Sequence, residues 1–198
     1  MINFTNKKLL DLRDVILIAF FMLGLIGFLN FESLLYNFTL KIVVIVIGLL
    51  LIFTFILTKN EASDFFATII LFLSFYNLYN LYYSLNWPLW LLMIIGIMLT
   101  ISIFNLLFWS VRSSLTGIHL IIYSLLLVLM MLELFLSLIY WPIDPKSKSL
   151  MMVAIFYVLG GVLHLKIENN MNWKTITPYG IISLIVLALT ITTSIWNN

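Results

Sequence analysis

The stretch FFATIILFLSFYNLYNLYYSLNWPLWLLMIIGIMLTISIFNLLFWSV, from Phe65 to Val111, decides the fold because it contains no charged side chain. One straight helix of this length would measure about 70 Å, whereas the hydrocarbon core of a bilayer is about 30 Å thick. The stretch must therefore turn back on itself. Asn86-Trp87-Pro88 marks the turn, because proline ends one helix and suits the first turn of the next. We expect one membrane span on each side of this turn.

The composition of the whole chain agrees with this reading. Of its 198 residues, 64% are hydrophobic and only 9% are charged. Soluble domains carry roughly 45–50% apolar and about 25% charged residues. This small number of charged side chains cannot cover a water-facing surface. The hydrophobic side chains must therefore face lipid. The composition predicts an all-α integral protein of the cell membrane, with residues 1–198 forming a single membrane domain.

Charged residues, prolines and polar turns divide the chain into helix-length apolar runs. They predict a polytopic bundle of seven transmembrane helices, at about 15–31, 40–58, 65–84, 88–110, 118–140, 149–165 and 178–196. We expect Trp141 to Pro145 to form a rigid loop before the sixth span. The seventh span should begin at Thr177-Pro178, with threonine as the N-cap and proline at the first helical position. No small-residue cleavage site follows the first span, so we expect that span to be retained.

The distribution of basic residues predicts the orientation. If the N-terminus is inside, seven of the ten lysines and arginines lie on the inner side and three on the outer side. The positive-inside rule then favours an N-in, C-out topology, although the outer pair Lys146 and Lys148 argues the other way. The tryptophans give a second check, because interfacial belts favour this residue. They fall near predicted span ends, at Trp87, Trp90, Trp109, Trp141, Trp173 and Trp196.

Glu133 is the most informative single residue, because it is the only ionisable side chain well inside a predicted span. A charged acid at this depth costs several kcal/mol, and such residues usually face the interior of a helix bundle. One interpretation is a site for a proton, a cation or a cationic substrate. The alternative is a protonated acid that joins two helices by hydrogen bonds.

Polar side chains on two other predicted spans are expected at the depth of Glu133. In the third span several of them fall on one side of the helix at 100° per residue, and the seventh span adds a threonine. We therefore predict an outward-facing polar pocket that binds a small polar or cationic ligand. The alternative is that these side chains join helices, each contributing about 0.6 kcal/mol. The predicted pocket residues are Glu133, Ser74, Tyr76, Asn77, Asn80 and Thr190.

Other chemistry finds little support in the sequence. His119 and His164 should lie near the inner surface, but catalytic zinc generally needs three protein ligands, so we predict no metal site and no cofactor. The chain has no cysteine, which excludes thiolate and disulfide chemistry. No basic run tracks a phosphate backbone, so nucleic acid is not an expected partner. Signatures of hydrolytic enzymes are missing, and we do not expect an enzyme.

Two functions of different classes remain open. The first is a small-molecule or ion carrier, or a substrate-binding membrane component, built around Glu133. The second is a non-catalytic structural or assembly subunit, which needs only a hydrophobic bundle held together by polar contacts. Its partners would be the lipid bilayer and another membrane protein or further copies of the chain. A lipid-modifying enzyme that uses Glu133 as an acid or base is a third, weaker option.

Overall fold

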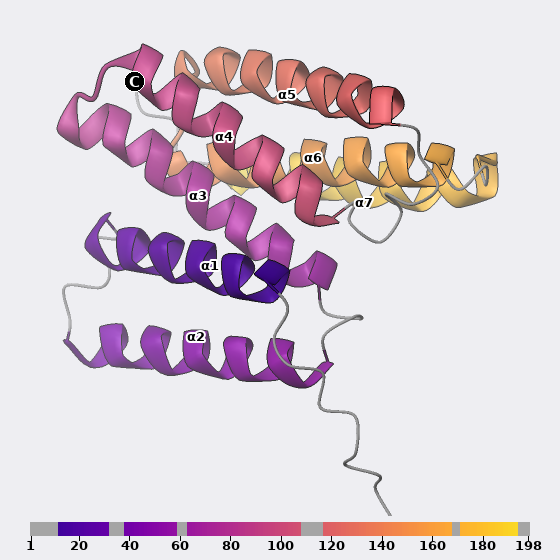
Figure 1. Cartoon of the computed structure of the whole chain (residues 1–198). Helices are drawn as coiled ribbons and strands as arrows, with labels where there is room; N and C mark the ends of the chain where they lie inside the picture. The colour runs from indigo at the N-terminus through magenta and orange to yellow at the C-terminus, as the bar shows by residue number, and fades with distance from the viewer. Residues whose placement is uncertain (1–11, 32–37, 59–62, 108–116, 168–170, 194–198) are drawn as a thin grey trace, which may run out of the picture. The chain divides into compact units, whose positions relative to one another are not determined.

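The computed structural model describes residues 12–31, 38–58, 63–107, 117–167 and 171–193 (Figure 1). Side chains are described for residues 14–31, 40–53, 66–105, 121–167 and 171–192. The regular structure of these ranges consists of seven α-helices, which confirms the prediction of an all-helical chain. The helices are α1 (Leu12–Phe31), α2 (Phe38–Thr58), α3 (Ser63–Leu85), α4 (Leu89–Leu107), α5 (Gly117–Ile139), α6 (Pro145–Ile167) and α7 (Trp173–Thr193).

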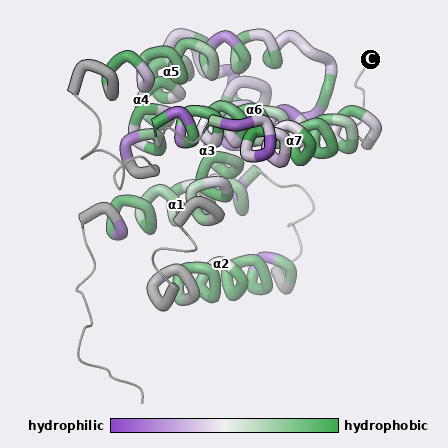
Figure 2. The backbone as a smooth tube through the Cα atoms, turned by 90° about the vertical axis from the view of Figure 1, so that its right-hand side faces the viewer, coloured by the Kyte–Doolittle hydropathy of each residue, from purple (hydrophilic) through white to green (hydrophobic). Residues whose placement is uncertain are grey.

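Hydrophobic residues dominate most of each helix (Figure 2). Among the described residues, four helical segments are long and apolar enough to cross a membrane: Asp14–Phe31, Ile121–Ile139, Pro145–Ile167 and Trp173–Thr192. Two shorter apolar segments, Leu40–Phe53 and Leu89–Asn105, belong to α2 and α4. Many large apolar side chains are exposed, as in the membrane-facing surface of a helical membrane protein. The structure thus supports a helical membrane protein.

The chain forms two compact units, which are described separately: an N-terminal unit up to Ile70 and a C-terminal unit from Leu71. In the N-terminal unit, α1 and α2 pack where Gly48 leaves room for Leu25. A Cβ atom on Gly48 would come within 2.7 Å of the Leu25 side chain. The Phe21 ring stacks on the Phe66 ring with 4.9 Å between their centroids.

In the C-terminal unit, α6 and α7 form an antiparallel helical hairpin (Figure 1). A Cβ atom on Gly161 would lie 2.3 Å from the Tyr179 ring, so this position requires glycine for the close approach. The buried hydroxyl of Ser183 also donates a hydrogen bond of 2.7 Å to the carbonyl of Ala154. Glycine packing and a polar contact between helices therefore hold this hairpin together.

The turn predicted at Asn86-Trp87-Pro88 is confirmed, because α3 ends at Leu85 and α4 begins at Leu89. Asn86 has a φ of 51°, a left-handed conformation that asparagine tolerates better than most residues. The carbonyl of Pro88 accepts the first helical amide bonds of α4, from Leu91 at 3.1 Å and Leu92 at 3.3 Å.

The prediction that Pro145 belongs to the loop before the sixth span was wrong, because α6 begins at Pro145. Asp144 is the N-cap: its carboxylate accepts bonds from the Ser147 amide at 3.0 Å and the Ser147 hydroxyl at 2.6 Å. Proline at the next position suits the first turn of a helix because it has no amide hydrogen to satisfy. Lys146 and Lys148 therefore belong to the first turn of α6.

The predicted start of the seventh span was also wrong, because α7 begins at Trp173 and contains Pro178 in its interior. Asn172 and Thr175 form the cap. The Thr175 hydroxyl donates to the carbonyl of Asn172 at 2.7 Å and accepts from its amide at 3.1 Å. This reciprocal cap satisfies end groups of the helix and starts α7 before the proline.

Candidate functional site

The end of the C-terminal unit where α3 and α5 finish and α6 begins holds a buried lysine. Lys148 is only 1% exposed. Its ammonium group donates to the hydroxyl of Tyr83 and, at 3.2 Å, to the carbonyl of Ile139. The Tyr83 hydroxyl donates to the same carbonyl. We call Lys148, Tyr83 and the Ile139 carbonyl the lysine cluster.

The position of Ile139 explains the lysine cluster. Ile139 is the last residue of α5, so its carbonyl has no amide donor from the helix that it ends. A cation near the C-terminus of a helix also interacts favourably with the helix dipole. Lys148 and Tyr83 thus cap α5 and join the ends of three helices. The sequence suggested only a loop lysine, and the Asp-Pro helix start was the available signal of its true position.

Aromatic rings cover the lysine cluster. The Lys148 nitrogen lies 4.3 Å from the centroid of the Tyr83 ring and 5.8 Å from that of Tyr79. These distances fall in the range in which an ammonium group is attracted to a ring face. Tyr79 is fully buried, with its ring centroid 4.9 Å from that of Phe135 on α5. Within the described part of the chain, the Tyr79 hydroxyl has no hydrogen-bond partner.

Glu133 does not face the interior of the helical bundle as expected. Its side chain is exposed on α5. Phe135, which contacts α3 through Phe75 and Tyr79, is buried and lies about 160° around the helix from Glu133. The expected interior position of Glu133 is therefore corrected, whereas its role in binding stays a prediction.

The other predicted pocket residues are mostly buried. Ser74, Tyr76, Asn80 and Thr190 are buried, and Asn77 is half-buried. Two of them bond to their own helices: Asn80 donates to the carbonyl of Tyr76 at 2.8 Å, and Thr190 to the carbonyl of Val186 at 2.7 Å. The four residues of α3 share one helix, but the structure does not bring Glu133 to the side of α5 that faces them.

The structure describes the side chain of one of the two histidines. His164 is half-buried near the end of α6, and the side chain of His119 lies outside the described side chains. Among the described residues, no group of three histidine, cysteine, aspartate or glutamate side chains is placed to hold a metal ion.

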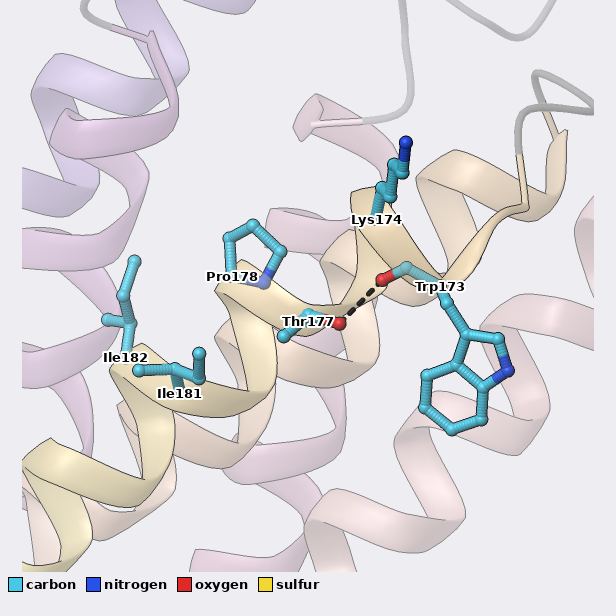
Figure 3. A pocket seen from close by; sticks show the side chains of 6 residues that line it. All are labelled: Trp173, Lys174, Thr177, Pro178, Ile181 and Ile182. Atoms are coloured by element: carbon cyan, nitrogen blue, oxygen red, sulfur yellow. Dashed lines mark hydrogen bonds between the residues drawn. The ribbon is translucent and has the colours of Figure 1, made fainter.

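A hollow of about 600 Å³ lies along the first half of α7 (Figure 3). All its lining residues come from this one helix, so it is a surface groove and not a chamber inside the bundle. The Thr177 hydroxyl donates to the carbonyl of Trp173 at 2.6 Å, so its hydrogen is not available to a ligand. The groove residues are Trp173, Lys174, Thr177, Pro178, Ile181 and Ile182.

The helices and the exposed apolar surface of the described residues support a helical membrane protein. The chain belongs to the family DUF5656, described as proteins of unknown function, whose family model matches residues 12–193. No curated protein and no solved structure matches the chain.

Proposed function

We propose that the chain crosses the cell membrane seven times, with its N-terminus inside and its C-terminus outside. The shortest helix, α4, has 19 residues and measures about 28 Å, close to the thickness of the hydrocarbon core. The pair Lys146 and Lys148 argued against this orientation. The capping contact of Lys148 with the carbonyl of Ile139 gives one of the two lysines a structural reason to lie at that end of α5.

We propose that the protein acts as a non-catalytic assembly subunit. It joins another membrane helix through the exposed side of α5 that carries Glu133. The observation that carries this proposal is the exposure of Glu133 within a row of exposed apolar side chains. The row follows the 3.6-residue period of a helix and comprises Ile122, Leu126, Leu129, Met130, Glu133 and Ser137.

Energetics favour a partner over lipid at this face. An acid left in contact with hydrocarbon costs several kcal/mol, and intramembrane acids rarely face lipid. A hydrogen bond between transmembrane helices contributes about 0.6 kcal/mol on average and about 1.7 kcal/mol at most. A neighbouring helix that covers the Glu133 carboxyl group and offers it a polar side chain removes the cost of leaving this acid in contact with hydrocarbon, which is the larger of the two energies. That helix belongs to a second copy of the chain or to another subunit.

The experiment compares Glu133→Gln and Glu133→Leu with the matched control Ile121→Ala, which alters an exposed apolar side chain of α5 outside this row. The purified chain is reconstituted alone in lipid nanodiscs, and its mass is compared with that of the complex cross-linked in native membranes. We expect Gln to keep the association and Leu to weaken it about tenfold or more, while the control changes little. If Glu133→Leu associates as tightly as the unaltered chain, the proposal fails.

A carrier of a small polar molecule or ion is the second candidate, and the fully buried Tyr79 hydroxyl favours it. This hydroxyl lies on the ring beside the Lys148 ammonium, so the two groups could hold an acceptor such as a water molecule or a carboxylate. Glu133 would bind a ligand only where a partner helix encloses it. Thermal shifts with acetate, phosphate and sodium test the carrier. A shift that disappears in Tyr79→Phe supports it, and no shift with any probe contradicts it.

A further inference from the structure

The groove on α7 is independent of the α5 face and has its own chemistry. Its two walls are rows of residues four positions apart, which lie one above another along the helix. One row is Trp173, Thr177 and Ile181, and the other is Lys174, Pro178 and Ile182 (Figure 3). The groove is open along its length, so a ligand in it would also contact the surrounding lipid.

The groove is polar at the beginning of α7 and apolar further along the helix, as a membrane leaflet is polar at its headgroups and apolar at its acyl chains. At the beginning of α7, Trp173 is 81% exposed and Lys174 is also exposed. Tryptophan and lysine are the residues that anchor helices at the headgroup level. About two turns deeper, the walls are the exposed side chains of Ile181 and Ile182. The groove therefore offers a cation at its polar end and hydrocarbon at its deep end.

Pro178 adds a second polar group at the same end. Proline has no amide hydrogen, so the carbonyl of Lys174 receives no helical bond from position 178. The Lys174 carbonyl is therefore left with capacity to accept a hydrogen bond from outside the helix. Beyond Thr177 the lining residues are Pro178, Ile181 and Ile182, so that part of the groove is apolar.

We propose that this groove binds an anionic glycerophospholipid from the leaflet in which α7 begins. The Lys174 ammonium pairs with the phosphate, the Lys174 carbonyl accepts a headgroup hydroxyl, and one acyl chain lies along Pro178, Ile181 and Ile182. A phospholipid with a glycerol headgroup satisfies all three features. A zwitterionic lipid carries its own cation beside the phosphate and gains less from Lys174.

Native mass spectrometry of the full chain in detergent tests the site, with phosphatidylglycerol and phosphatidylcholine as probes. We expect phosphatidylglycerol to bind more tightly, and Lys174→Gln to lower its affinity about fivefold without changing that for phosphatidylcholine. Lys166→Gln is the matched control, because it removes an exposed charge from the neighbouring end of α6. Its effect should be under twofold.

The variant Thr177→Trp distinguishes binding of lipid in the groove from attraction of lipid by general surface charge. The large ring fills the hollow, so the affinities for both lipids should fall while the melting temperature in detergent stays unchanged. Equal losses from Lys174→Gln and Lys166→Gln would overturn the proposal, because they would reveal attraction by surface charge alone. A change of oligomeric mass in Thr177→Trp without a change in lipid affinity would also overturn it, because the groove would then hold a protein helix.

Discussion

The cap on α5 predicts a specific coupling between two residues that are far apart in sequence. Lys148 and Tyr83 both donate to the carbonyl of Ile139. If either donor is removed, the other still satisfies this carbonyl. If both are removed, the buried carbonyl has neither donor, which costs about 1–3 kcal/mol.

The expected magnitudes follow from these contacts. Lys148→Met loses a charge-assisted hydrogen bond worth about 1.5–3 kcal/mol and a cation–π contact of about 0.5–2 kcal/mol. It also removes the cost of burying an ammonium group, which is several kcal/mol. We therefore expect Lys148→Met to change the free energy of unfolding by about 1 kcal/mol or less. In the Lys148→Met background, where the bond between Lys148 and Tyr83 is already gone, adding Tyr83→Phe takes the last donor from the Ile139 carbonyl and should cost about 1–3 kcal/mol.

The assay is reversible unfolding of the purified chain in mild detergent by added dodecyl sulfate, followed by circular dichroism. Tyr82→Phe is the matched control, since it removes a hydroxyl from the neighbouring residue. In the Lys148→Met background it should cost about 0.5 kcal/mol or less. If, in that background, Tyr83→Phe costs no more than Tyr82→Phe, the shared cap on Ile139 is refuted.

Two further perturbations test the interior of the C-terminal unit. Gly161→Ala would place a Cβ atom 2.3 Å from the Tyr179 ring, so we expect a loss of about 1–3 kcal/mol in the same unfolding assay. Gly160→Ala is its control, because the nearest atom is 3.9 Å away, and equal losses from the two variants would contradict the packing. Tyr79→Phe removes a buried hydroxyl that has no hydrogen-bond partner among the described residues, so we expect no loss of stability. A loss above about 1 kcal/mol would show that this hydroxyl has a partner in the membrane.

The sequence predicted the helices well because their limits depend on local chemistry. Proline at position 88 and asparagine at 86 identified a turn that the structure confirms. The two errors in helix starts have the same local origin. Asp144-Pro145 was interpreted as loop, and Thr177-Pro178 was taken as a cap although Asn172 and Thr175 provide one earlier.

The burial of Lys148 and the orientation of Glu133 could not be predicted from the sequence, for physical reasons. Lys148 is buried because its ammonium group meets Tyr83, which lies on another helix, and periodicity carries no information on that contact. The orientation of Glu133 was wrongly expected because α5 is apolar on every side. Lipid is as apolar as a leucine-rich interior, so hydrophobicity does not reveal which face of a membrane helix is covered.

The proposed topology has seven crossings, and α4 is the critical helix because, at 19 residues, it is the shortest of the described helices. Asn86 precedes α4 and Asn172 follows α6, so three proposed crossings separate them. The chain lacks cysteine, which allows Asn86→Cys and Asn172→Cys to be labelled singly with a membrane-impermeant maleimide. We predict that Asn86→Cys is labelled in intact cells and Asn172→Cys only after the membrane is opened. Labelling of both from the same side would contradict the seven-span account.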